Sequence, residues 1–242
     1  MLPDCLLTYL RAHAPLVVAL SGGTDSAVLL AVAVTAGVKV AAVTVDTGLV
    51  PAEEVEVAAR TARACGVRHE TLSVEMCAQE AVRENTPERC YVCKRTMMER
   101  VIEWARAHGY QYVADGTHAD DVPEGRPGMR ALAELGVFSP FAACGIGRDE
   151  IRRLADILGV EVRPSSSCMA TRIPEGATVT AGAMRRAYEA EELLRRAGIP
   201  GRVRVRVSGR SARVEVPEGY RGQVRSLVPD IKTVGFDEVE VV

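Results

Sequence analysis

A short segment rich in glycine and hydroxyl groups, placed directly after an apolar run, is the part of this chain best suited to chemistry. Residues 16–20 read Leu-Val-Val-Ala-Leu, and residues 21–26 read Ser-Gly-Gly-Thr-Asp-Ser. Two glycines let the backbone approach a ligand closely, and a helix that begins after them directs unpaired N–H groups and its positive dipole end at the same point. The spacing therefore predicts a phosphate-binding turn between a strand and a helix, with a nucleotide as the ligand. An ordinary turn with polar caps is the alternative.

This segment resembles the PP-loop of the ATP pyrophosphatase superfamily, whose members split ATP between its alpha and beta phosphates and transfer AMP to a substrate oxygen. A Walker A loop would need Gly-Lys-Ser/Thr at a fixed offset, which the sequence does not have. The resemblance implies adenylylation of a substrate, with Mg²⁺ held by the phosphates and by Asp25. The predicted ATP-binding residues of the turn are Ser21, Gly22, Gly23, Thr24, Asp25 and Ser26.

Cysteines form the second candidate site. Cys90 and Cys93 follow Thr-Pro, so the pair is expected to open a helix, where the dipole and the flanking arginine and lysine favour thiolate. Cys168 lies in a polar loop bounded by prolines, and three thiolates could meet there. The spacing alone leaves three interpretations open: thioredoxin-like redox chemistry, a structural zinc with His118 or another cysteine as fourth ligand, and an iron-sulfur cluster.

Strand and helix patterns alternate along the first two thirds of the chain, which predicts an α/β fold with a doubly wound parallel sheet. Glycines such as Gly37, Gly66 and Gly159 end several of the helices as C-caps do. The expected strands are 16–20, 38–45, 68–73 and 110–114, and the expected helices are 26–35, 52–64, 91–108 and 149–158.

Ligands of such sheets bind at the carboxyl ends of the strands, where the glycine turn would meet two further segments. Asp46 follows the second expected strand, and Gly116 and Thr117 follow the fourth, so we add these residues to the ATP site. The loop 116–128, with its proline, glycines and aspartates, is the best candidate for a mobile loop over the site.

After the proline-bounded loop 164–174 the pattern changes to a helix at 181–197, strands at 203–207 and 212–216, a short helix, and a last strand near 234–242. We therefore divide the chain into a PP-loop domain, residues 1–163, and a small C-terminal α+β domain, residues 164–242, which would bind substrate and support oligomerisation.

Composition narrows the class of protein. The chain has 242 residues with a net charge of −2, so an extended RNA-binding face is not expected. We find neither a leader peptide nor a run long enough to span a membrane, and we expect a cytoplasmic protein. In that compartment the 7 cysteines are expected to be thiols or metal ligands rather than disulfides, with Cys5, Cys65, Cys77 and Cys144 as small apolar fillers.

Taken together, the motifs resemble the LarE family of ATP-dependent sulfur transferases, which supply sulfur to the pyridinium nucleotide precursor of the nickel-pincer cofactor. Departures from the family pattern are His118 where asparagine is expected, Met169 and Thr171 in place of Leu and Ser, and Val207-Ser208 in place of a His pair. The matching segments are 21–26, 43–46, 87–94, 115–121 with 126–128, 139–140, 150–152, 164–174, and 204–206 with 212–216.

The resemblance implies ATP-dependent sulfur insertion into the carboxylates of a pyridinium mononucleotide. One family type sacrifices the sulfur of the cysteine matching Cys168, and the other holds a 4Fe-4S cluster on three cysteines and carries sulfide on the open iron. Because all three cysteines are present, the resemblance assigns Cys90, Cys93 and Cys168 to a cluster supplied by sulfide or a sulfur donor. It also implies a closed homo-oligomer.

Arg204 and Arg206 alternate along an expected strand and so point to one face, where they could grip a substrate phosphate or carboxylate. A solvated basic face is the alternative. The resemblance adds Arg172 and Glu192 to this substrate site.

Three other functions share parts of this pattern. A tRNA thiolation enzyme would have an RNA-binding domain or a strongly basic face, which we do not find. An amidotransferase synthetase would not need the three cysteines. A non-enzymatic ATP-binding iron-sulfur redox sensor would keep nucleotide and cysteines without turnover.

Overall fold

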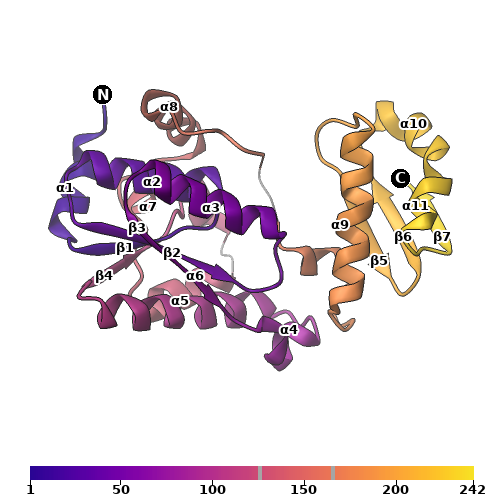
Figure 1. Ribbon diagram of the computed structural model, residues 1–242, viewed down its shortest axis with the longest axis horizontal. Coiled ribbons are helices and arrows are strands. Elements are labelled where there is room, and N and C mark those ends of the chain that lie inside the picture. The colour runs from indigo at the N-terminus through magenta and orange to yellow at the C-terminus, as the bar shows by residue number, and fades with distance from the viewer. Residues whose placement is uncertain (125–126, 165–166) are drawn as a thin grey trace. The chain divides into compact units, whose positions relative to one another are not determined.

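The computed structural model describes residues 1–124, 127–164 and 167–242 (Figure 1). It divides into two compact units, Met1–Glu75 with Cys90–Ser166, and Met76–Arg89 with Ser167–Val242. Three residues of the family-like motifs, Arg126, Ser165 and Ser166, lie outside the described residues, as does part of the loop 116–128.

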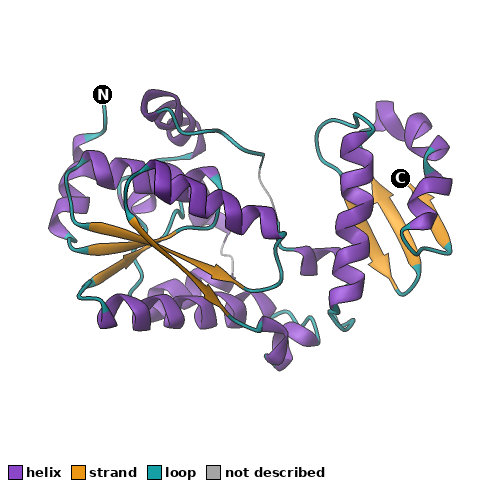
Figure 2. Ribbon diagram, viewed as in Figure 1, coloured by secondary structure: helices purple, strands orange, loops and turns teal. Residues whose placement is uncertain are grey.

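The first unit is built on a four-stranded parallel sheet of order β3-β2-β1-β4 (Figure 2). Its strands are β1 (Leu16–Ala19), β2 (Val40–Asp46), β3 (Arg68–Ser73) and β4 (Tyr112–Ala114). The α/β class and the parallel sheet predicted from the sequence are confirmed.

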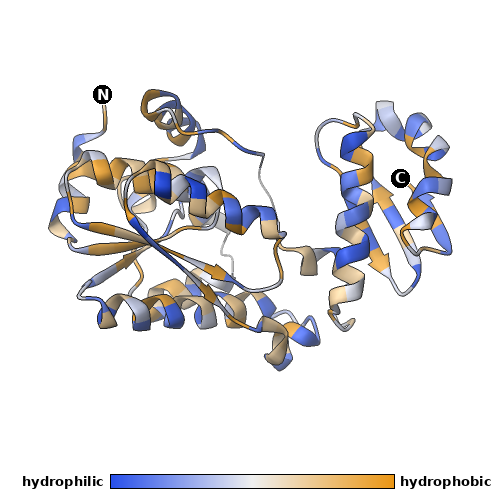
Figure 3. Cartoon of the chain, in the orientation of Figure 1, coloured by the Kyte–Doolittle hydropathy of each residue, from blue (hydrophilic) through white to orange (hydrophobic). Residues whose placement is uncertain are grey.

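Helices cover both faces of this sheet, with α5 and α6 on the opposite side from α2 and α3 (Figure 1). Alternate strand residues explain the two layers, since Leu16 and Val18 join one apolar cluster and Val17 joins the other. Figure 3 shows the two central strands coloured as hydrophobic over most of their length. The helices are α1 (Asp4–Ala12), α2 (Thr24–Thr35), α3 (Ala52–Ala64), α5 (Arg89–Ala107), α6 (Pro127–Leu135), α7 (Pro140–Ala143) and α8 (Arg148–Leu158), with the 3₁₀ helix η2 (Ala119–Glu124).

The second unit holds a three-stranded sheet of order β5-β6-β7, in which β5 (Arg204–Ser208) and β6 (Ser211–Glu215) are antiparallel and β7 (Glu238–Val241) is parallel to β6. Helix α9 (Ala181–Arg196) packs against β5, and buried residues alternate with more exposed ones along both β5 and β6. The unit also contains η1 (Met76–Ala78), α4 (Glu80–Arg83), η3 (Met169–Arg172), η4 (Glu218–Tyr220), α10 (Arg221–Ser226) and α11 (Val228–Thr233).

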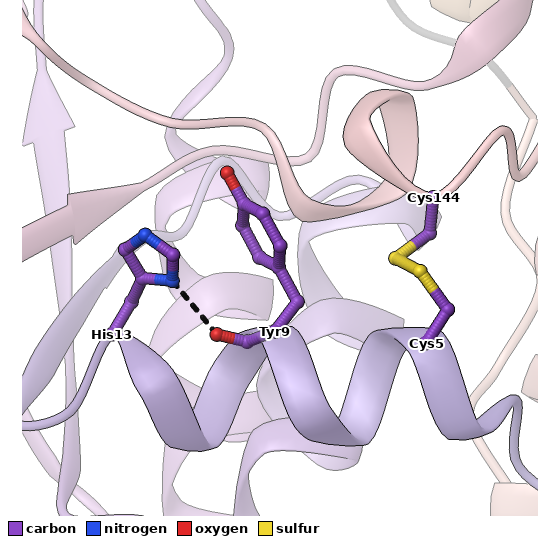
Figure 4. The surroundings of a disulfide bond; sticks show 4 residues. All are labelled: Cys5, Tyr9, His13 and Cys144. Carbon is purple, nitrogen blue, oxygen red and sulfur yellow. Dashed lines mark hydrogen bonds between the residues drawn. A yellow bond between two sulfur atoms is a disulfide. The ribbon is translucent and has the colours of Figure 1, made fainter.

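The expectation that Cys5 and Cys144 are separate apolar fillers is wrong. The two residues form a disulfide that joins α1 to the end of α7, with 6.0 Å between their Cα atoms (Figure 4). Neither short helix was expected from the sequence, so nothing in the pattern indicated that these cysteines are neighbours. Among the described residues no helix is both long and apolar enough to cross a membrane.

Candidate functional site

The glycine turn sits between β1 and α2, as its spacing predicts. Gly22 has φ of +83°, and a Cβ atom there would lie 2.3 Å from the carbonyl oxygen of Glu54, so only glycine fits. Gly23 is the N-cap of α2 and, being glycine, has no side chain that could cap the first turn of the helix. The amides of the first turn of α2 therefore remain available to an anion.

Hydrogen bonds within the turn fix its shape. The N–H of Ser21 donates to Ser26 Oγ at 3.1 Å, and Ser26 Oγ lies 3.2 Å from the carbonyl oxygen of Gly23. Ser21 Oγ accepts from the N–H of Gly23 at 3.3 Å. The two serines thus tie the ends of the turn together, which holds its amides in one arrangement.

A second glycine brings the loop after β4 against the same helix end. A Cβ atom on Gly116 would lie 2.8 Å from the backbone nitrogen of Ser26. Because real Cβ contacts are not this short, the loop after β4 can lie against the start of α2 only with glycine at this position. The carboxyl ends of β1 and β4 are joined in this way.

A cavity of about 430 Å³ opens where these segments meet. Gly22, Thr24 and Asp46 do not line it: Thr24 Oγ1 accepts from the N–H of Arg163 at 2.9 Å, and Asp46 Oδ1 accepts from the N–H of Gly48 at 3.0 Å. The predicted ATP-site residues that do line it are Ser21, Gly23, Asp25, Ser26, Gly116 and Thr117.

Burial raises the pKa of Asp25 above the ordinary value, and the neighbouring Asp121 carboxylate raises it further. His118, Arg148 and Arg152 act in the opposite direction. A half-buried carboxylate beside a second one, in a cavity at the start of a helix, is a suitable place for a divalent cation, because the cation compensates the charges that the protein leaves close together.

The same cavity contains residues that the sequence analysis used otherwise. Lys94, assigned there to support the cysteine thiolates, lines the cavity with its Nζ 3.9 Å from Asp115 Oδ2. Asp115 is buried and accepts hydrogen bonds from Thr117 Oγ1 at 2.7 Å and from Ser139 Oγ at 2.6 Å. Lys94 is four residues after Cys90 on a helix. This spacing is the signal in the sequence that could have placed both side chains on one face of the helix.

His118, a possible fourth zinc ligand in the sequence analysis, is buried, and its Nδ1 lies 3.4 Å from Asp121 Oδ2 without a hydrogen bond. Cys90 and Cys93 lie at the N-terminal end of α5 and belong to the first unit; Cys168 precedes η3 in the second unit. In the part of the chain that the structure describes, no group of three or more His, Cys, Asp or Glu side chains is arranged to hold a metal ion.

Arg172 is among the most deeply buried side chains of the second unit. Its guanidinium forms a two-pronged ion pair with Glu191, Nε to Oε1 at 2.7 Å and Nη2 to Oε2 at 2.9 Å. Its Nη1 donates to Ser167 Oγ at 2.6 Å and to the carbonyl oxygen of Cys168 at 3.4 Å. Because its donors are used inside the protein, Arg172 orients the Cys168 segment, and we propose this role for it in place of a substrate contact.

The family resemblance assigned Glu192 to this region, but the buried carboxylate is that of its neighbour Glu191. Glu191 is 1% exposed and also accepts from the N–H of Val205 at 3.0 Å, whereas Glu192 is half-buried and pairs with Arg195. Helical spacing from the buried Ala187 and Leu194 of α9 places position 191 on the covered face, which is the signal that could have found it.

Arg206 lines a cavity of about 740 Å³ on the polar face of the second sheet. Its Nε donates to Glu215 Oε1 at 2.9 Å, and its Nη1 donates to the carbonyl oxygen of Thr171 at 2.7 Å. Arg204 donates to the carbonyl oxygen of Val203 at 3.0 Å. Burial lowers the pKa of Arg204, and the charge of Arg172 lowers it further, while the carboxylate of Glu191 acts in the opposite direction.

Comparison with known proteins gives both a family and individual relatives. The model of the family described as queuosine biosynthesis protein QueC matches residues 15–189. An uncharacterised protein of Synechocystis sp. is 35% identical over 218 residues, covering 88% of this chain and 80% of that protein. An uncharacterised protein of Methanocaldococcus jannaschii is 30% identical over 171 residues, or 69% of this chain and 68% of that protein.

The pyridinium-3,5-bisthiocarboxylic acid mononucleotide synthase of Lactiplantibacillus plantarum is 31% identical over 209 residues. The match covers 85% of this chain and 75% of the synthase, and so extends through most of both proteins.

The substitution Gly116→Ala is expected to lower the free energy of unfolding by about 1 to 3 kcal/mol, because its methyl group must displace the backbone of α2. Gly128→Ala is the matched control, since its Cβ would lie 3.5 Å from the nearest side chain, which is ordinary contact. Urea denaturation of both variants measures the difference. Equal stabilities for the two variants would contradict the close approach at Gly116.

The substitution Glu191→Gln is expected to lower the free energy of unfolding by about 3 to 5 kcal/mol, because it leaves the buried guanidinium of Arg172 without its counter-charge. Glu192→Gln, one position along the same helix, removes only a half-exposed pair and should cost less than about 1 kcal/mol. The comparison uses the same denaturation assay. If the two variants lost equal stability, Glu191 would not be the residue that anchors Arg172.

Proposed function

Because this chain belongs to the LarE family of PP-loop sulfur transferases, we propose that it inserts sulfur into the carboxylates of a pyridinium mononucleotide, using ATP to activate each carboxylate. The observation that carries the proposal is the cavity at the carboxyl end of the parallel sheet, in which the first turn of α2, Asp25 and Lys94 face one space. The likeness to the L. plantarum synthase supplies the substrate class.

ATP would bind with its phosphates at the amides of the first turn of α2, where the helix dipole favours anions. Lys94 supplies a positive charge in the same cavity, and Asp25 would hold Mg²⁺ bound to the phosphates. The cavity volume of about 430 Å³ falls within the range of small-molecule sites.

In the first step a carboxylate oxygen of the substrate attacks the alpha phosphorus of ATP. A new P–O bond forms, the bond to the bridging oxygen breaks, and pyrophosphate leaves with that electron pair. The positive charges around the cavity stabilise the charge that develops on the leaving pyrophosphate. In the second step a sulfide equivalent attacks the carbonyl carbon of the acyl adenylate, and AMP leaves with the C–O electron pair to give a thiocarboxylate.

Cys90, Cys93 and Cys168 are the proposed ligands of a 4Fe-4S cluster. The donor chemistry fits, since Cys90 and Cys93 are three residues apart at the N-terminal end of α5 and cysteines are the usual ligands of such clusters. A cluster with three protein ligands would supply one iron able to carry sulfide. Thr171 Oγ1 and the guanidinium of Arg172 hold the carbonyl of Cys168, which orients this segment independently of a metal.

The anionic groups of the substrate would bind at Arg204 and Arg206, with Arg204 as the first contact because its guanidinium is partly buried next to other positive charges. Arg206 already holds Glu215 and the carbonyl of Thr171, so a substrate anion there would compete with Glu215.

ATP with a dicarboxylated pyridinium mononucleotide is expected to give AMP and pyrophosphate, and Asp25→Asn should lower the rate at least about tenfold, as loss of a metal-site residue does. Burial raises the pKa of Asp25 above 3.8, the ordinary value for aspartate. As the pH is lowered, Asp25 should therefore become protonated, and Mg²⁺-dependent activity should begin to fall, at a pH above 3.8. Asp149→Asn, whose side chain is 99% exposed, is the control.

Release of ADP and phosphate, measured by chromatography of the nucleotides, would contradict this assignment. So would equal rates for Asp25→Asn and Asp149→Asn.

Alanine substitution of Cys90, Cys93 or Cys168 is expected to lower bound iron in an anaerobic preparation and to abolish sulfur transfer, while AMP release persists because its residues lie elsewhere. Cys65→Ala, at a half-buried cysteine at the end of α3, should change neither property. Iron analysis and mass spectrometry of product measure both.

The sacrificial mechanism predicts a different result. Cys90→Ala and Cys93→Ala would then complete one transfer, and the spent protein would lose about 34 Da, the mass of H₂S removed when a cysteine becomes dehydroalanine, a change outside the usual oxidation ladder. An unmodified Cys168 in an iron-free anaerobic preparation would contradict both mechanisms.

A further inference from the structure

We propose that Cys5 and Cys144 form a redox site that controls the nucleotide cavity by restraining residues 138–148. The proposal concerns a pair of cysteines outside the sulfur-transfer machinery. The proposal rests on the proposed function only in the measurement of Mg-ATP binding, which is used as a probe of the cavity.

The two cysteines are placed for exchange with a small thiol. Cys5 lies in the first turn of α1 and is exposed, and Cys144 is the half-buried C-cap of α7 (Figure 4). An attacking thiolate therefore reaches the sulfur of Cys5 more readily, and Cys144 is the leaving group. Exposed disulfides are typically the labile or regulatory ones.

Cys144 lies between two sets of contacts with the wall of the nucleotide cavity. Before it in sequence, Ser139 Oγ donates to Asp115 Oδ1 at 2.6 Å, and the N–H of Asp115 donates to the carbonyl oxygen of Phe138 at 3.0 Å. Asp115 lines the cavity. A tether at Cys144 therefore restrains the segment that positions this carboxylate.

After Cys144 the chain contacts the next part of the same wall. The N–H of Ala119 donates to the carbonyl oxygen of Ile146 at 2.9 Å, and Asp120 Oδ2 accepts from the N–H of Arg148 at 2.7 Å. Residues 115–121 are thus bonded to the chain on both sides of the disulfide, and they include four of the residues that line the cavity, Asp115, Gly116, Thr117 and Asp121.

The segment keeps other contacts with α1 when the disulfide is reduced. The ring of Phe138 lies 4.7 Å from that of His13 and 5.8 Å from that of Tyr9, centroid to centroid, and Phe141 is fully buried. Reduction therefore loosens one attachment and leaves the fold in place. The expected effect of reduction is that residues 115–121, in the wall of the cavity, become less restrained.

The disulfide is reduced by exchange with two molecules of a glutathione-class thiol. The first thiolate attacks Cys5 Sγ, the S–S bond breaks, and Cys144 departs as a thiolate. A second thiolate attacks the external sulfur of the mixed disulfide, releasing Cys5 as a thiolate and forming the external disulfide. The protein gains two electrons, and protons from the two external thiols are available to its cysteines. Oxidised glutathione reverses the sequence.

The test uses the full chain equilibrated with reduced or oxidised glutathione, comparing wild type, Cys5→Ser and the control Cys65→Ser. Cys65 is also a half-buried cysteine beside the core that Cys144 contacts, but it is not part of the disulfide. Peptide mapping by mass spectrometry follows the Cys5–Cys144 linkage. Hydrogen exchange of residues 115–121 and 138–148 and the dissociation constant of Mg-ATP give the effect on the cavity.

In oxidised glutathione, wild type and Cys65→Ser are expected to contain the Cys5–Cys144 linkage, and reduction should speed exchange in both segments. The dissociation constant of Mg-ATP should rise by about two- to thirtyfold on reduction, the range of energetic coupling between distant residues. Cys5→Ser should show the reduced behaviour in both buffers.

Absence of the linkage in oxidised glutathione overturns the proposal, and so does a linkage whose reduction changes neither hydrogen exchange nor ATP binding. If Mg-ATP binds in neither state, the proposed function fails, while hydrogen exchange of residues 115–121 still decides whether the disulfide controls the wall.

Discussion

Two close approaches between backbone segments determine the candidate nucleotide site, and both require glycine. Gly22 lies against the carbonyl of Glu54, and Gly116 lies against the nitrogen of Ser26. These contacts bring the glycine turn, α3 and the loop after β4 to one edge of the sheet, with the amides of α2 beside Asp25 and Lys94. A larger residue at either glycine would separate elements that must converge for a phosphate site to exist.

In the second unit the buried pair of Arg172 and Glu191 has the corresponding role. Taking both charges out of water is costly, and the cost is offset because every strong donor and acceptor of the pair has a partner. The pair joins α9 and β5 to the turn that carries Cys168. Cys168, for which we propose a role in sulfur transfer, is thereby attached to a buried part of its unit, which favours a defined orientation of its thiol.

Local patterns predicted the strands, the main helices and the glycine turn, because apolar periodicity and glycine end signals are properties of neighbouring residues. Features that depend on contacts between distant segments were not predictable in this way. The Cys5–Cys144 disulfide spans 139 residues, and Met76–Arg89 belongs with the C-terminal unit although no local signal separates it from the first. Helical spacing indicates that Glu191 is covered, but its pairing with Arg172 depends on contacts between segments distant in sequence. The place of Lys94 at the cavity depends on such contacts too.

Adenylylation of the substrate carboxylate is tested by following the carboxylate oxygen. A pyridinium mononucleotide with heavy oxygen in its carboxylates is incubated with ATP, Mg²⁺ and sulfide under anaerobic conditions, and the products are analysed by mass spectrometry. Activation by adenylylation predicts one labelled oxygen in AMP for each thiocarboxylate formed, because the attacking oxygen leaves with the nucleotide. Thiocarboxylate without label in AMP, or AMP without transfer of label, would contradict activation by adenylylation.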